Sequence, residues 1–234
     1  MFRITAPLIA AAVVSLAPVA AQANLTIPTN FLVATSVQAF PLENREAFEL
    51  VGLSVAARGT AFVVEAADPA APSTPGAFGF PITKIVIGSK LNIVSGTAAG
   101  SALYFNRNVD ADFDGIFEKT VGLTLANFTI DYNRKKVLAD TTPAGGKTSY
   151  QTAIYDFTVQ TPLALKYKFP LNITLHEVLG NLMLTPETKD IFRSALELDE
   201  LAEGALELPY GTLTQDVTSK LRPKAISTKP YVAK

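Results

Sequence analysis

The chain has 234 residues, with 20 basic and 21 acidic side chains and a formal net charge of −1. This near-neutral balance argues against nucleic acid as a partner, and it gives no sign of a broad anionic surface as a target. The sequence contains no cysteine, which excludes disulfides, thiol nucleophiles and thiolate metal sites, and a chain of this length can bury a core without them.

The first 23 residues have the pattern of a cleaved secretory signal. Arg3 precedes an almost unbroken apolar run over residues 6–19, and Ala21-Gln22-Ala23 supplies the small-x-small cleavage pattern. The run is too short for a comfortable membrane span. We therefore expect an exported protein without a transmembrane segment, periplasmic, secreted or at the cell surface. The alanine-rich signal and the absence of cysteine favour a bacterial source.

Most of the remaining chain has the pattern of β-strands. Short runs rich in Val, Ile, Thr, Phe and Tyr recur between Gly, Pro, Asn and Asp residues. Asn133-Arg134 and residues 144–147 predict hairpin turns, whereas residues 68–76, with three prolines, predict an exposed loop. The predicted strands cover residues 48–56, 60–66, 82–87, 90–94, 102–105, 116–125, 128–132, 135–139, 148–160, 163–169 and 172–175.

One late segment has helical rather than strand spacing. Thr185 is a good N-cap, and Pro186 suits the first helical position. Apolar side chains then recur at helical spacing, at Ile191, Ala195, Leu198 and Ala202. The sequence therefore predicts an all-β fold, an antiparallel β-sandwich with one amphipathic α-helix over about residues 186–203. A single domain would span residues 24–219, and residues 220–234 would form a basic, flexible tail.

The stretch NVDADFDGIFEK, residues 108–119, crowds four acidic side chains around Gly115. Carboxylates that alternate along a tightly curled loop are ligands that calcium prefers. An EF-hand loop counted from Asp110 needs an acid at its twelfth position, which is Val121. The pattern D-x-D-x-D-G-x-x-E instead resembles the calcium loops of β-hairpins in the propeller domains of integrin α chains. That resemblance implies calcium ligands at Asp110, Asp112, Asp114, Glu118 and the backbone carbonyl of Ile116. The alternative is an acidic turn without an ion.

The sequence lacks most motifs of catalytic sites. It contains no G-x-S-x-G motif, and Gly146-Lys147-Thr148 does not complete a phosphate-binding loop. His176 is the only histidine, which makes zinc sites implausible. A carboxylate pair for glycoside hydrolysis stays open, because it depends on a separation in space.

Three short motifs in the second half suggest a family. Residues 123–127 (LTLAN), 137–140 (VLAD) and 209–212 (PYGT) follow one another in the order found in HtaA-type domains. These are exported β-domains that bind haem through Tyr and His, and the resemblance spans about residues 121–218. It implies a haem site, with His176 and Tyr210 as its first candidates. The family's closing aromatic-Tyr-x-x-Gly element is only partly matched by Tyr210-Gly211, and His176 is otherwise a surface or turn histidine.

The first functional hypothesis is an exported, non-enzymatic protein with a structural, adhesion or matrix role at the cell surface, stabilised by calcium at one hairpin. It would have a cell-surface or matrix partner. The alternative is a module that binds haem or another apolar small molecule. A secreted hydrolase with paired carboxylates is the second alternative.

Calcium binding by residues 110–118 predicts that millimolar calcium raises the melting temperature of the mature protein. A ligand that binds only the native state stabilises that state by mass action. Asp112→Ala removes one ligand carboxylate and should abolish the rise, which thermal unfolding with and without the ion measures. No shift at millimolar calcium would contradict the site.

Overall fold

The computed structural model describes residues 24–89, 92–110, 117–169 and 172–233, so the predicted signal peptide lies outside it. The described chain forms β1 (Leu25–Pro28), β2 (Leu32–Ala39), α1 (Leu42–Leu50), β3 (Leu53–Gly59), β4 (Phe62–Asp68), β5 (Ala71–Pro81), β6 (Lys84–Ile87), β7 (Ile93–Val109), β8 (Lys119–Asp131), β9 (Lys136–Pro143), β10 (Ser149–Lys168), β11 (Asn172–Leu184), α2 (Pro186–Leu196), α3 (Glu200–Glu203), a short 3₁₀ helix (Gly204–Glu207) and β12 (Thr212–Leu221). Among these residues, no helix has the length and apolar character needed to cross a membrane.

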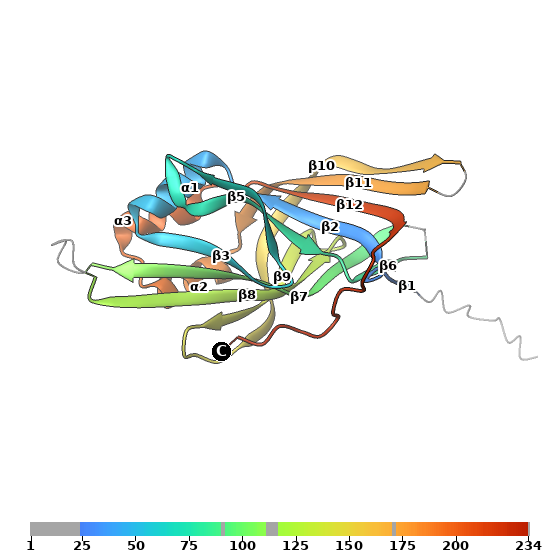
Figure 1. Ribbon diagram of the computed structural model, residues 1–234. Helices are drawn as coiled ribbons and strands as arrows, with labels where there is room; N and C mark the ends of the chain where they lie inside the picture. Colours follow the sequence, from blue (N-terminus) through green and yellow to red (C-terminus); the bar gives the residue numbers. More distant parts are fainter. Residues whose placement is uncertain (1–23, 90–91, 111–116, 170–171, 234) are drawn as a thin grey trace, which may run out of the picture.

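All the strands belong to one antiparallel sheet. Its order is β1-β6-β7-β8-β9-β10-β11-β12-β2-β5-β4, and β3 pairs with β7 beside that path. The sheet curls, the helices gather at one end, and the β10–β11 hairpin projects from the other (Figure 1). The predicted all-β antiparallel fold with a late helix is confirmed. The two layers expected of a β-sandwich are parts of one continuous, curled sheet.

Aromatic rings fill the inner face of the sheet at the helical end. Phe192 of α2 packs edge-on against Phe105 of β7, with 5.0 Å between ring centroids. Tyr210 lies at the centre, 5.5–6.3 Å from the rings of Phe40, Phe48, Tyr155 and Phe192. These contacts attach the helices to the sheet, because each helix that carries a ring inserts it into the same cluster.

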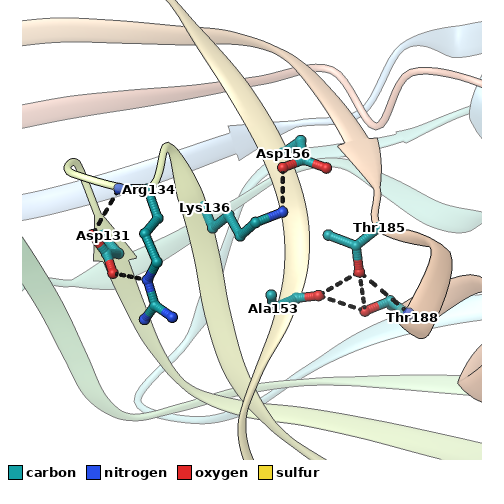
Figure 2. Close-up of polar contacts among 7 residues, drawn as sticks. All are labelled: Asp131, Arg134, Lys136, Ala153, Asp156, Thr185 and Thr188. Atoms are coloured by element: carbon teal, nitrogen blue, oxygen red, sulfur yellow. Dashed lines mark hydrogen bonds and ion pairs between the residues drawn. The ribbon is translucent and has the colours of Figure 1, made fainter.

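Helix α2 begins as predicted and ends earlier. The Thr185 side chain accepts a hydrogen bond from the Thr188 amide at 3.3 Å, and Figure 2 shows both hydroxyls beside the carbonyl of Ala153 on β10. Glu197 then adopts a left-handed conformation, with φ of 49°. The predicted helix over residues 186–203 is therefore split into α2 and α3, with Asp199 as the N-cap of the second.

The strand predicted over residues 48–56 is wrong in its first half. Residues 42–50 form α1, in which Phe48 is buried and Leu50 is 88% exposed. The spacing of Phe48 and Leu50, two residues apart, is that of one face of a strand, but here it falls on a helix of which only one face packs on the sheet. The period of the apolar pattern was therefore misread.

The exposed loop predicted over residues 68–76 is also wrong. After a turn at residues 69–70, β5 begins at Ala71, and both Ala71 and Thr74 are fully buried. The register between β4 and β5 shifts between Ala67 and Asp68. Prolines are tolerated in such an irregular pairing, because it does not require every ladder hydrogen bond.

The predicted turns at residues 133–134 and 144–147 are confirmed as the connections from β8 to β9 and from β9 to β10. Polar pairs support these strands. Arg134 bonds Asp131 across the first turn, and Lys136 on β9 bonds Asp156 on β10, each at 2.6 Å (Figure 2).

Residues 222–233 contain no helix or strand and run along the sheet (Figure 1). The guanidinium group of Arg222 donates to the carbonyl oxygens of Leu32 and Ala34, at 2.6 and 2.8 Å. Farther on, the amide of Tyr231 donates to Asn127 at 2.8 Å. Hydrogen bonds thus attach this segment at two places, and its flexibility stays a prediction.

The cap at Thr185 predicts that Thr185→Ala lowers the free energy of unfolding by about 1–2 kcal/mol, because an N-cap and a buried hydrogen bond are lost together. Ser194→Ala is the matched control, since Ser194 is exposed on the same helix, and it should change stability by only a few tenths of a kcal/mol. Denaturant unfolding measures both variants. Equal stability of the two would contradict a role for the cap.

Candidate functional site

The β10–β11 hairpin is longer than the sheet that flanks it. Strand β9 pairs with β10 only from Ser149 to Asp156. Beyond that point β10 pairs with β11 alone, as far as the register of Lys168 with Asn172. The edge of β10 in the outer hairpin is therefore left without β9 as a partner.

A groove of about 300 Å³ lies between this hairpin and the strands that face it. It is formed by β1, the start of β2, β6, the start of β7, and the outer parts of β10, β11 and β12. Its aliphatic lining consists of Ile27, Leu32, Ile85, Ile87, Ile93, Leu163, Leu165, Ile173, Leu175 and Val217. The volume and the lining are those of a small-molecule site at the lower end of the usual range.

The alternation of side chains along β10 decides which ones reach the groove. Leu163 and Leu165 line it, and Lys166 lies on the opposite face because successive side chains of a strand point to opposite faces. Leu165 is 66% exposed, although it belongs to the apolar face. Within the described part of the chain, the apolar side of the hairpin is therefore covered only in part: Leu175 packs against a core cluster, whereas Leu165 stays largely exposed.

The groove leads inward to a second cavity of about 20 Å³, large enough for one water-sized group. The two share five lining residues, Ile85, Ile93, Leu163, Leu175 and Val217. The polar members of the inner cavity are Tyr132, Glu177 and Gln215. The Tyr132 hydroxyl donates to Glu177 at 2.5 Å, so an apolar path ends at a buried carboxyl group.

Glu177 is only 5% exposed, and burial raises the pKa of its carboxyl group, while the hydrogen bond from Tyr132 partly lowers it. The pKa of Tyr132 is raised by burial and by the neighbouring Glu177. No second carboxylate lines the described walls of either cavity. The paired-carboxylate hypothesis therefore gains no support from this site.

His176 and Tyr210 are not brought together by the fold. His176 lies on the outer face of β11, where its Nδ1 is 2.7 Å from Asp216, and its side chain is 47% exposed. Tyr210 is fully buried in the aromatic core, and burial raises the pKa of its hydroxyl well above the ordinary value. Within the described residues, the Tyr210 hydroxyl has no hydrogen-bond partner.

The hairpin predicted to carry the calcium loop is present. Val109 of β7 pairs with Lys119 of β8, and the Glu118 amide donates to the carbonyl of Val109 at 3.0 Å. Asp112, Asp114 and Ile116 lie outside the described residues, and the described ones contain no group of three acidic or histidine side chains placed to hold a metal. Calcium binding at this hairpin stays a prediction.

The groove was not found from the sequence, although one signal for it was present. Residues 163–169 alternate apolar and other side chains, as LALKYKF, which predicts a strand with one apolar face. Such a face is normally covered by the fold. Only the structure shows that it stays open here.

The raised pKa of Glu177 predicts a pH-dependent stability. The folded state binds the proton more tightly than the unfolded chain, so the stabilisation is fully present below the unfolded pKa and is lost as the pH rises through the folded pKa. Glu177→Gln removes this titration and should gain in unfolding free energy relative to the wild type from pH 4 towards neutral pH, as measured by denaturant unfolding. Tyr132→Phe removes the hydrogen bond that lowers the Glu177 pKa, so it should raise that pKa further and enlarge the loss of stability with rising pH. A difference between Glu177→Gln and the wild type that stays constant with pH would contradict the assignment.

No protein-family model and no curated protein matches the chain. Two solved structures from Corynebacterium glutamicum are similar to it. The C-terminal domain of HtaA is 12% identical, with a TM-score of 0.44, and the match covers 80% of this chain and 98% of that one. The heme binding protein HtaB is 14% identical, with a TM-score of 0.48 and coverage of 86% and 98%. The predicted resemblance to HtaA-type domains is thus confirmed at low identity, and it carries no residue's role over to this chain.

Proposed function

We propose that the protein is an exported, non-enzymatic module that binds an apolar small molecule in the groove between the β10–β11 hairpin and strands β1, β6 and β7. The observation that carries this proposal is the groove itself, about 300 Å³ in volume and lined by aliphatic side chains. Haem is the first ligand to test, because the sequence resemblance to HtaA-type domains implies it.

Physical chemistry favours an apolar ligand at this place. Each aliphatic side chain that a ligand covers contributes on the order of 1 kcal/mol, in proportion to the area removed from water. Leu165 and Ile173 are 66% and 41% exposed without a ligand, so they have area left to bury. A largely pre-formed groove also spares a ligand most of the cost of ordering the protein.

The binding hypothesis is better supported than the two others. An adhesion or matrix role does not explain an aliphatic groove with a buried polar inner end. A hydrolase of the kind considered needs two carboxylates, and among the described residues that line the groove and its inner cavity Glu177 is the one acid.

Titration of the protein with hemin, followed by the Soret band, tests the proposal. Leu165→Gln/Ile173→Gln places two amides in the groove and should weaken binding at least about tenfold, because two apolar contacts are lost. Lys166→Gln/Thr174→Gln is the matched control: it makes the same replacement at the next position of each strand, on the opposite face, and should leave binding unchanged. The apolar dye N-phenyl-naphthylamine serves as a second probe of the same groove.

Two further variants separate the groove from the residues implied by the family resemblance. His176→Ala and Tyr210→Phe should retain binding, since His176 is on the outer face and Tyr210 is in the core. Loss of the Soret band in His176→Ala, with the Leu165→Gln/Ile173→Gln variant unaffected, would place haem on the outer face and contradict the proposal. So would a protein that binds neither hemin nor the dye.

A further inference from the structure

The end of the molecule at which the groove opens carries an unusual concentration of exposed apolar side chains. On the β10–β11 hairpin, Leu165, Tyr167 and Phe169 are 66%, 59% and 84% exposed. Phe31, in the turn between β1 and β2, and Leu221, at the end of β12, are 58% and 69% exposed. Their backbones adjoin, because Leu221 pairs with Leu32 and the Arg222 amide donates to the carbonyl of Phe31. Large exposed apolar patches on soluble domains mark interaction sites.

The same end is positively charged. Residues 157–176 contain Lys166 and Lys168 and no acid. Lys220 and Arg222 follow at the end of β12, where the guanidinium group of Arg222 donates to the carbonyl oxygens of Leu32 and Ala34. By the register of β10 with β11, Lys166 and Lys168 lie on one face of the hairpin, opposite to the face of Leu165 and Tyr167. The acid near them, Asp216, is already paired with His176 at 2.7 Å. Basic side chains therefore flank the apolar tip without local acids to neutralise them.

We propose that this end of the protein docks on an anionic lipid membrane, with residues 165–169 at the outer end of β10 placed among the lipid headgroups. Aromatic and aliphatic side chains bind the boundary between headgroups and acyl chains, and lysines beside them bind anionic headgroups. The described strands of the hairpin project beyond the rest of the molecule (Figure 1). Their outer end therefore reaches a flat surface before the body of the protein does.

A lipid surface fits this patch better than a protein partner. The outer end of the hairpin is a narrow two-stranded projection (Figure 1), whereas protein interfaces of useful affinity need two complementary surfaces of substantial area. The groove opens between the same strands. Docking therefore places an apolar binding site next to the lipid membrane, in which apolar molecules dissolve. Membrane docking does not depend on which ligand fills the groove.

Co-sedimentation with vesicles tests the inference, using protein that begins at Asn24 and phosphatidylcholine vesicles with and without phosphatidylglycerol. The protein should bind the anionic vesicles, and added salt should weaken binding. Lys166→Gln/Lys168→Gln should weaken it roughly 25-fold, about fivefold for each lysine. Phe169→Ser should weaken binding further without changing the net charge. All three positions are exposed, and circular dichroism verifies that the variants fold.

The matched control is Lys119→Gln/Lys147→Gln, which removes the same charge at the hairpin and turn on the opposite end of the sheet. It should bind anionic vesicles as the wild type does. Three results would overturn the inference: no binding of the wild type to anionic vesicles, equal loss in the control and the hairpin variant, or unchanged binding by the lysine variant. Self-association that Phe169→Ser removes, with no vesicle binding, would also overturn it and identify the patch as an interface between copies of the protein.

Discussion

A curled sheet has an inner face along its whole length, and the apolar side chains on that face need cover at both ends. At one end the cover is complete, because α1, α2 and the segment around Tyr210 insert aromatic rings between the strands. At the other end β10 and β11 continue past the last pairing with β9, and no helix of the described chain covers them. The aromatic core, the aliphatic groove and the exposed hairpin tip are three stretches of this one inner face, which differ in how much cover they have.

The polar groups of the sheet are satisfied where its strands become irregular. Asn127, with a φ of 55°, lies opposite the bulge of β7, where its side chain accepts from the Gly100 amide and donates to Asp140. Asp140 in turn accepts two hydrogen bonds from Gln151. Irregular pairing leaves backbone groups without ladder partners, and an unpaired buried group costs about 1–3 kcal/mol. The Asn127 side chain also donates to the carbonyl oxygen of Tyr231. The network that satisfies the backbone at the bulges therefore also holds the C-terminal segment on the sheet.

Neighbouring residues on β11 have different environments because they point to opposite faces. Glu177 faces inward, accepts a hydrogen bond from Tyr132 and closes the inner end of the groove. His176 faces outward and pairs with Asp216 in contact with solvent. The chemistry of the groove therefore depends on a buried carboxyl group and an aliphatic lining, and the only histidine of the chain takes no part in it. The sequence resemblance to HtaA-type domains selected His176, because those domains bind haem through Tyr and His, whereas an isolated glutamate next to it gave no signal.

By itself the sequence determined the all-β class, the turns at residues 133–134 and 144–147, the cap at Thr185 and the hairpin around residues 110–118, because each depends on residues close together in the chain. It misread α1 and the start of β5, where the deciding contacts are with distant strands. The LALKYKF segment identified an apolar face on β10, but an apolar face is compatible with a buried strand and with an open groove. Only the tertiary structure decided between them, because the answer depends on where β9 stops relative to β10, and no local pattern records the relative lengths of paired strands.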